Sequence, residues 1–316
     1  MQNFLLSARA VLPMFLMIAA GYFCRRVGVL SREDVPRFNR VAFRVFLPCL
    51  LFYNVYVSDL SSAVRPRLIV FAVVGVLVVA ALAIVGVLRF VPEPERRGVI
   101  AQGIFRSNYV IMGIPIAQAL LGEGNLGPIA ILIAIVVPLF NFLAVAVLES
   151  FRGGKVRPGT VLLEIAKNPL VVSSVLGILC LLLHVRLPEV VESAVSGLGA
   201  VATPLQLFLL GAFFRFEGLA RYKKPLAVVT AIKLFITPAV MLFLAYALGF
   251  RGVEFVALIG VFASPTAVNS FTMVQQMDCG DAELAGDIVI ATSAVSVFSA
   301  VTMFVWIFLF KTLGIF

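Results

Sequence analysis

Charged side chains are scarce in this chain of 316 residues. They make up 13% of it, about half of the roughly 25% found in soluble domains. Hydrophobic residues make up 62%, and the mean hydropathy is +1.10. No soluble fold of this length has an interior large enough to bury that much apolar surface, which excludes a soluble protein. The net charge of +9 does not indicate a nucleic-acid partner, because the basic residues lie in short loops between apolar runs.

Residue types that carry chemistry are also few. There is one histidine, and the four cysteines lack metal-ligand spacing: Cys24, Cys49, Cys180 and Cys279. The chain has no nucleotide-binding loop, serine-hydrolase motif or zinc-protease motif. We therefore expect neither an enzyme nor a cofactor or metal site. His184 and Trp306 lie near the outer ends of apolar runs, where we expect them at the membrane interface.

Long apolar runs dominate instead. A membrane-spanning helix needs about 20 mostly apolar residues, and ten runs meet that length. They are residues 4–24, 36–57, 66–90, 98–121, 127–149, 160–184, 190–214, 224–248, 252–277 and 284–310. The first run lacks a small-residue cleavage site, so we interpret it as a retained helix. The prediction is an all-α polytopic protein of the cell or inner membrane, surrounded by lipid.

Lysine and arginine set the orientation. If the N-terminus is outside, 17 of the 25 Lys and Arg residues fall in cytoplasmic loops and six fall outside. This bias predicts that both termini are outside. Arg106 and Lys233 are the remaining two, and both fall within spans.

Landmarks of the first half recur in the second at an offset of 156 or 157. The pairs are Pro13 and Pro169, Gly21 and Gly177, Pro48 and Pro204, Phe52 and Phe208, and residues 103–107 with 260–264. We predict two five-helix repeats, 1–149 and 161–316, joined by a short cytoplasmic link, 150–160. Because five is odd, the second copy must be inverted, which places a binding site near the bilayer midplane.

Polar residues interrupt the fourth and ninth spans, and prolines mark both, Pro115 in the fourth and Pro265 in the ninth. Proline breaks a helix, and unwound backbone at this depth must be buried or line a cavity. Freed helix N-termini attract anions. The predicted substrate-binding residues are Arg106, Ser107, Asn108, Tyr109, Ser264, Pro265, Thr266 and Asn269. The alternative is a simple proline kink packed by Ser and Thr.

The sequence Asn-Tyr-Val-Ile-Met-Gly-Ile-Pro at residues 108–115 resembles the Asn-Thr-Leu-Val-Met-Gly-Ile-Pro stretch of plant auxin efflux carriers. The resemblance to this family implies a crossover fold like that of bile-acid/sodium symporters. It implies a scaffold of spans 1, 2, 6 and 7, a transport domain of spans 3–5 and 8–10, elevator-like movement, and a homodimer. It also implies organic carboxylate substrates, with Asn108 at the first crossover and Pro265 at the second. The chain departs from the plant pattern at Ser107, where plant members have proline, and it lacks their long cytoplasmic loop.

Two intramembrane cations and the coupling ion stay open. Arg106 is expected to contact substrate or counter-ion, pair with an acid, or snorkel; Lys233 is expected to snorkel or act in function. No acidic residue lies deep in a predicted span, so coupling to H+ or Na+ cannot be assigned. The main hypothesis is a secondary carrier of a small organic anion. The alternatives are a sodium-coupled symporter of another small solute, and a membrane enzyme or channel.

Overall fold

The computed structural model describes residues 2–31, 33–58, 65–110, 127–152, 158–298, 306 and 310. Within these ranges the chain is helical, apart from connecting segments and one isolated β-bridge. The helices of the first half are α1 (Gln2–Arg26), α2 (Asp34–Val41), η1 (Ala42–Phe46), α3 (Leu47–Tyr56), α4 (Pro66–Phe90), α5 (Pro94–Phe105) and α7 (Gly127–Ser150). Those of the second half are α8 (Pro158–Lys167), α9 (Pro169–Leu182), α10 (Glu189–Phe213), α11 (Phe216–Arg221), α12 (Lys223–Ala231), η2 (Ile232–Ile236), α13 (Thr237–Ala247), α14 (Gly252–Ala263), α15 (Asn269–Met277) and α16 (Ala282–Phe298).

Four helices of the described part are long and apolar enough to cross a membrane. They are α4, α7, α10 and the continuous helix Lys223–Ala247, which contains α12, η2 and α13. Helices α8 and α9 add a fifth candidate if they count as one span. The prediction of an all-helical, multi-pass membrane protein is therefore confirmed. The count of ten spans, their inversion and the sides of the termini stay predictions.

The run 160–184, predicted as one span, is bent by 62° between α8 and α9. The bend falls at Asn168, whose extended backbone (φ −68°, ψ 123°) fits the restriction that a following proline imposes. Pro169 begins α9 where its missing N–H costs nothing, and the Asn168 side chain accepts from the Leu170 N–H at 3.0 Å. Local capping chemistry thus starts a new helix inside the apolar run.

Two wide π-helical turns, η1 and η2, precede Pro48 and Pro238 within otherwise continuous helices. A proline inside a helix clashes with the carbonyl four residues before it, and a π-turn is one way to relieve that clash. For Pro238 the carbonyl is that of Leu234, and it accepts a hydrogen bond from Trp306 Nε1 at 3.2 Å. Trp306 is 8% exposed, so its prediction as an interface anchor is wrong: its indole N–H satisfies a buried carbonyl instead.

Helix pairs with the closest approach meet at repeat landmarks. Gly21 of α1 faces α10 so tightly that an added Cβ would lie 1.8 Å from the Phe208 carbonyl oxygen. Gly177 of α9 faces α3, where the corresponding distance to the Phe52 oxygen is 2.9 Å. Gly21 and Gly177 are related by the repeat offset, and so are the residues that they meet, Phe208 and Phe52. A two-fold rotation that exchanges the two repeats produces this kind of reciprocal contact.

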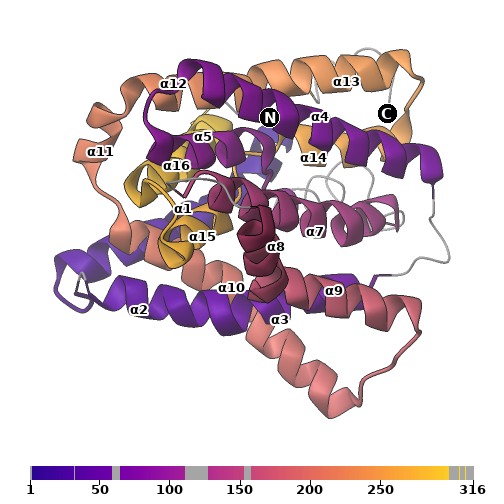
Figure 1. The fold of residues 1–316 in the computed structure, drawn as a ribbon, viewed down its shortest axis with the longest axis horizontal. Coiled ribbons are helices and arrows are strands. Elements are labelled where there is room, and N and C mark those ends of the chain that lie inside the picture. Colours follow the sequence, from indigo (N-terminus) through magenta and orange to yellow (C-terminus); the bar gives the residue numbers. More distant parts are fainter. Residues whose placement is uncertain are drawn as a thin grey trace.

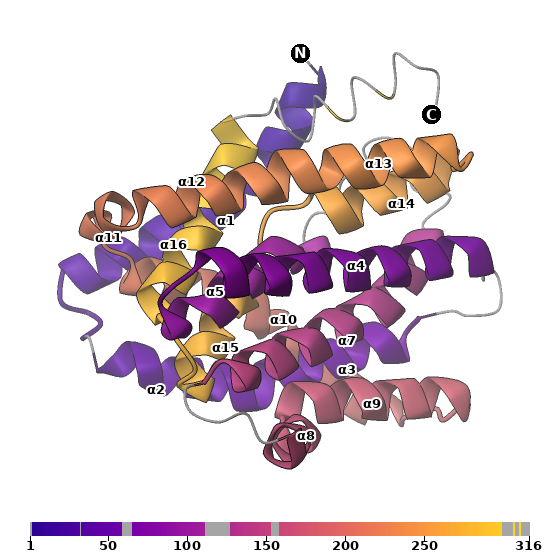
Figure 2. The same cartoon turned by 45° about the horizontal axis from the view of Figure 1, so that its top comes forward.

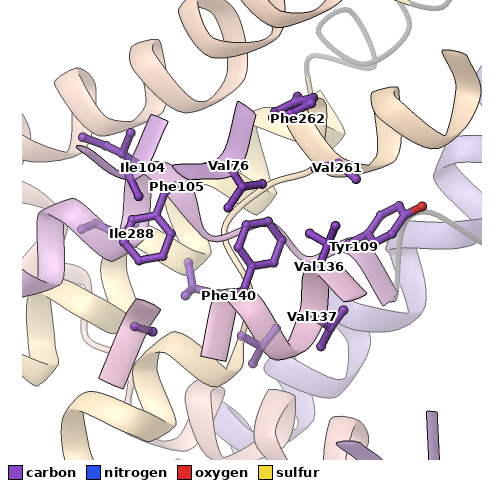
Figure 3. Close-up of a cluster of buried hydrophobic side chains, with 14 of the residues drawn as sticks. Val76, Ile104, Phe105, Tyr109, Val136, Val137, Phe140, Val261, Phe262 and Ile288 are labelled. Atoms are coloured by element: carbon purple, nitrogen blue, oxygen red, sulfur yellow. The ribbon is translucent and has the colours of Figure 1, made fainter. Parts of the chain in front are cut away.

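The helices lie on two sides of the molecule. Both views place α2, α3 and α9 along one side and α4, α12 and α13 along the other, with α5, α15 and α16 between them (Figures 1 and 2). A buried apolar cluster joins α4, α5, α7, α14 and α16 through residues such as Val76, Phe105, Phe140, Val261 and Ile288 (Figure 3). This cluster holds the ends of α5 and α14, which carry the polar residues described next.

Candidate functional site

Two helices end inside the protein and their following segments pair. Helix α5 stops at Phe105 and α14 at Ala263, and Arg106 and Ser264 are both in extended conformation. Ser107 and Thr266 form an antiparallel β-bridge, and the Asn108 N–H donates to the Pro265 carbonyl at 2.8 Å. Asn108 and Pro265 are 157 positions apart, so a residue pairs with its own repeat mate. Pro265 has no N–H and cannot return the bond.

Hydroxyl groups satisfy the carbonyls left free at these helix ends. Thr266 Oγ1 donates to the Gly103 carbonyl at 2.7 Å, across from α14 to α5. Ser107 Oγ donates in the opposite direction, to the Val261 carbonyl. Ser264 Oγ donates to Gly260 at 2.5 Å. The last carbonyls of a helix lack intrahelical partners. The Ser and Thr hydroxyls therefore stabilise the buried C-terminal ends of both α5 and α14.

A small cavity with both polar and apolar walls lies beside the paired segments, with a volume of about 50 Å³. One water needs about 10–15 Å³, so the cavity suits a molecule of a few heavy atoms. Its walls come from α3, α7, α10 and the segments following α5 and α14. The polar residues lining it are Asn54, Arg106, Ser107, Asn108, Tyr109, Asn141, Thr203, Gln206 and Asn269.

The cavity is rich in hydrogen-bond donors. Arg106 is 1% exposed; its Nη2 donates to Asn141 Oδ1 and its Nη1 contacts Met273 Sδ. Buried amide nitrogens of four lining residues have no hydrogen-bond partner among the described residues: Asn54, Asn108, Asn141 and Gln206. Arg106 is the charged residue of the lining, and none of the described lining residues is acidic. Unpaired buried donors around a guanidinium fit an anion.

The predicted site residues divide into two groups. Arg106, Ser107, Asn108, Tyr109 and Asn269 line the cavity. The others support it from behind: Ser264, Pro265 and Thr266 hold the paired backbone. Pro115 lies outside the described residues.

Four lining residues were not predicted, namely Asn54, Asn141, Thr203 and Gln206. The sequence feature that could have identified them is an amide or hydroxyl side chain inside an apolar run. Such a polar residue in a membrane helix is a candidate functional residue. The repeat argument alone could not find them, because each lies on a helix that the chain does not break.

Lys233 is buried beside the site and does not snorkel. It lies in η2, is 1% exposed, and its Nζ donates to Ser107 Oγ at 2.6 Å. Among the described residues no carboxylate pairs with it or with Arg106. The expected alternative that Arg106 pairs with an acid is therefore not observed within the described ranges.

The acidic segment around the start of α16 contains Asp278, Asp281, Glu283 and Asp287, and one of these residues is buried. Asp287, expected in a cytoplasmic loop, is 2% exposed in α16, with Oδ2 unpartnered among the described residues. It faces Gly218 of α11, where an added Cβ would lie 2.3 Å from Oδ2. Asp287 lies near the start of the tenth predicted span, 284–310, so its burial does not test the prediction that no acidic residue lies deep in a span.

Basic residues from other loops neutralise the neighbouring acids. Arg96 lies 3.7 Å from Asp281, and Arg221 lies 3.6 Å from Glu283. The Tyr222 hydroxyl donates to Asp281 Oδ2 at 2.7 Å. Burial raises the pKa of Tyr222, and its hydrogen bond to the carboxylate raises it further. The acidic segment, which contains no Lys or Arg itself, is thus held against basic residues and a tyrosine of neighbouring segments.

Comparison with known proteins gives matches over nearly the whole chain. Residues 6–307 match the family described as membrane transport protein. An uncharacterized transporter of Methanothermobacter thermautotrophicus is 23% identical over 304 residues, covering 93% of this chain and 96% of its own length. A provisionally named malonate transporter of Rhizobium meliloti is 26% identical over 294 residues, covering 89% and 90%. An uncharacterized transporter of Methanocaldococcus jannaschii is 22% identical over 297 residues, covering 90% and 93%.

Proposed function

The chain belongs to the membrane transport protein family, the auxin efflux carrier family, and from this premise we propose that it is a secondary carrier of a small organic anion. Family membership confirms that the chain is a transporter rather than an enzyme. The observation that carries the proposal is the cavity, with its buried guanidinium, four unpaired amide donors and no acidic residue among the described lining residues.

The substrate class is a small carboxylate. A guanidinium presents two parallel N–H groups that match a carboxylate, and charge-assisted bonds of this kind are about twice as strong as neutral ones. The volume of about 50 Å³ is far below the roughly 300–1,000 Å³ of drug-sized sites. The name of the Rhizobium meliloti relative refers to malonate, a small anion with two carboxylates. This supports a short dicarboxylate as the substrate.

Transport requires the cavity to open to each side in turn. Its walls come from α3 and α10 on one side, and from α7 and the two paired segments on the other. We infer that α1, α2, α3, α8, α9 and α10 form a static scaffold, and that the paired segments move against it with the bound anion. Two side-chain hydrogen bonds join α15 to α2 at this boundary, from Asn39 Nδ2 to Gln275 Oε1 and from Gln276 Nε2 to the Pro36 carbonyl. Few bonds must break for the two groups to slide.

A thermal-shift panel with the purified carrier tests the proposal. The panel pairs malonate, succinate and acetate with malonamide, succinamide and acetamide, each with sodium or with choline as the cation. We expect carboxylates to raise the melting temperature and their amides to leave it unchanged. Stabilisation by the amides, or by sodium alone, would favour the alternative of a sodium-coupled symporter of another solute.

A further inference from the structure

The buried ammonium of Lys233 lies where two interrupted helices end. Its Nζ donates to Ser107 Oγ at 2.6 Å, and that hydroxyl in turn donates to the Val261 carbonyl. Ser107 follows the C-terminus of α5, and Val261 lies in the last turn of α14. The C-terminal end of a helix carries free carbonyls and about half a negative charge. The ammonium therefore binds the hydroxyl that links the C-terminal ends of these two helices.

No carboxylate within the described ranges accounts for this charge. Helix η2 packs against α5, α14 and α16. The acids of these elements have other neighbours: Glu254 pairs with Arg65 and Glu283 with Arg221. Glu95 lies in the first turn of α5, at the opposite end of that helix from Ser107. Asp287 faces Gly218. The printed partner of the Lys233 ammonium is therefore a hydroxyl, Ser107 Oγ, rather than an acid.

In secondary transporters with interrupted helices, unwound carbonyls and half-helix C-terminal ends coordinate the coupling cation. Lys233 reaches the same kind of place through Ser107 Oγ, which follows the C-terminal end of α5 and donates to a carbonyl in the last turn of α14. We propose that the Lys233 ammonium is a built-in cation that occupies the coupling-ion position between the ends of α5 and α14, so that the carrier binds its anion without sodium. The inference rests on the proposed function, because it assumes that the adjacent cavity takes an anion.

Lys233 acts through Ser107 and is a positioning residue. Ser107 lines the cavity, whereas Lys233 does not. The ammonium fixes the Ser107 hydroxyl, so that both paired segments keep one geometry, and it adds a second buried positive charge next to Arg106. A fixed internal cation supplies continuously what a sodium ion supplies only when it is bound.

The first test compares sodium with choline in the wild-type carrier. Binding of [14C]malonate to the full chain in detergent is measured at equal ionic strength in each cation. The proposal expects dissociation constants within twofold of each other. A fivefold or larger requirement for sodium overturns it.

The second test replaces the ammonium. Lys233→Ala leaves a gap that ethylammonium fits, and we expect [14C]malonate affinity to fall at least tenfold and to return at least threefold with 50 mM ethylammonium or sodium. Ethanol and choline, the neutral and oversized controls, should not restore it. Equal rescue by ethanol, or wild-type affinity without any additive, overturns the proposal. Lys224→Ala, which removes an exposed lysine at the start of α12, is the matched control and should bind as the wild type does.

Two further measurements keep the test decisive. Lys233→Met keeps the length of the side chain without its charge and fills the gap; it should lose affinity at least tenfold without rescue by ethylammonium, and wild-type affinity in it overturns the proposal. Melting temperature gives a readout that needs no anion: sodium and ethylammonium should stabilise Lys233→Ala by several degrees and leave the wild type unchanged. If no carboxylate binds the wild type, the anion proposal fails while this cation-dependent shift still decides the role of Lys233.

Discussion

Single polar residues inside apolar helices line the cavity that we propose as the binding site. The sequence alone identified Arg106, Asn108 and Asn269, because they stand at interrupted spans. It did not identify Asn141 or Gln206, since each lies in a helix that continues without a break, and only the packing of α7 and α10 brings them to the cavity. From the sequence, Lys233 could either snorkel or act in function. The length of its side chain shows how far it reaches but not which groups it contacts.

Arg106 is expected to carry most of the anion affinity. A hydrogen bond to a charged group contributes about 1.5–3 kcal/mol, so Arg106→Gln should weaken [14C]malonate binding by about 10- to 150-fold. Arg89→Gln, at an exposed position near the end of α4, is the control and should change affinity less than twofold. Unchanged affinity in Arg106→Gln would remove the guanidinium from the site.

Asn141 offers a substitution that separates binding from folding. Its Oδ1 accepts from Arg106, so Asn141→Asp places a carboxylate of the same shape against the guanidinium. We expect the melting temperature to be kept or raised and malonate binding to fall at least tenfold, because the internal carboxylate competes for the same cation. Binding equal to that of the wild type would show that Arg106 does not face the anion.

At the scale of the elements, helix-breaking chemistry was predictable and its result was not. Pro265 marked the interruption between α14 and α15, but its pairing with Asn108 across the protein depends on two segments 157 residues apart. The apolar run 160–184 bends at Pro169. The sequence prediction missed this bend, because hydropathy does not register helix capping. The π-turns before Pro48 and Pro238 similarly follow from backbone clashes that the apolar pattern hides.

The contact between α1 and α10 should tolerate no side chain at its glycines. An added Cβ at Gly211 would lie 1.8 Å from the Ile18 carbonyl oxygen, whereas one at Gly197, in the same helix, meets nothing within 4 Å. Backbone cannot move aside cheaply, so Gly211→Ala should cost at least about 1–3 kcal/mol. Gly197→Ala should be neutral or stabilising by up to about 1 kcal/mol, because alanine favours the helix. The measurement is the melting temperature of each purified variant, and equal values would refute this close approach.

Over the whole molecule, composition predicted a multi-pass membrane protein and the repeat offset predicted two inverted five-helix copies. The contacts of Gly21 with the Phe208 carbonyl and of Gly177 with the Phe52 carbonyl were not predicted; they pair landmarks that the offset relates. The offset could not say which helices move, because the proposed scaffold and the proposed moving part each take helices from both repeats. The scaffold, the moving part and the side of each terminus stay predictions.

Locking the boundary between α2 and α15 should stop transport while binding persists. Asn39 and Gln275 meet there by a side-chain hydrogen bond. After the four native cysteines are replaced by serine, Asn39→Cys with Gln275→Cys should be bridged by mercury(II). We expect uptake into proteoliposomes to fall more than tenfold and malonate binding to stay within threefold. Undiminished uptake in the bridged protein would exclude movement across this boundary.

The central claim is that the cavity beside the paired segments carries a small carboxylate across the membrane. Counterflow tests it most directly: proteoliposomes loaded with unlabelled malonate are diluted into trace [14C]malonate, and label accumulates transiently only if one site serves both sides. We predict accumulation with the wild type, none with Arg106→Gln, and inhibition by external succinate but not by malonamide. Failure of the wild type to accumulate label from any carboxylate that stabilises it, or equal inhibition by malonamide, would contradict the claim.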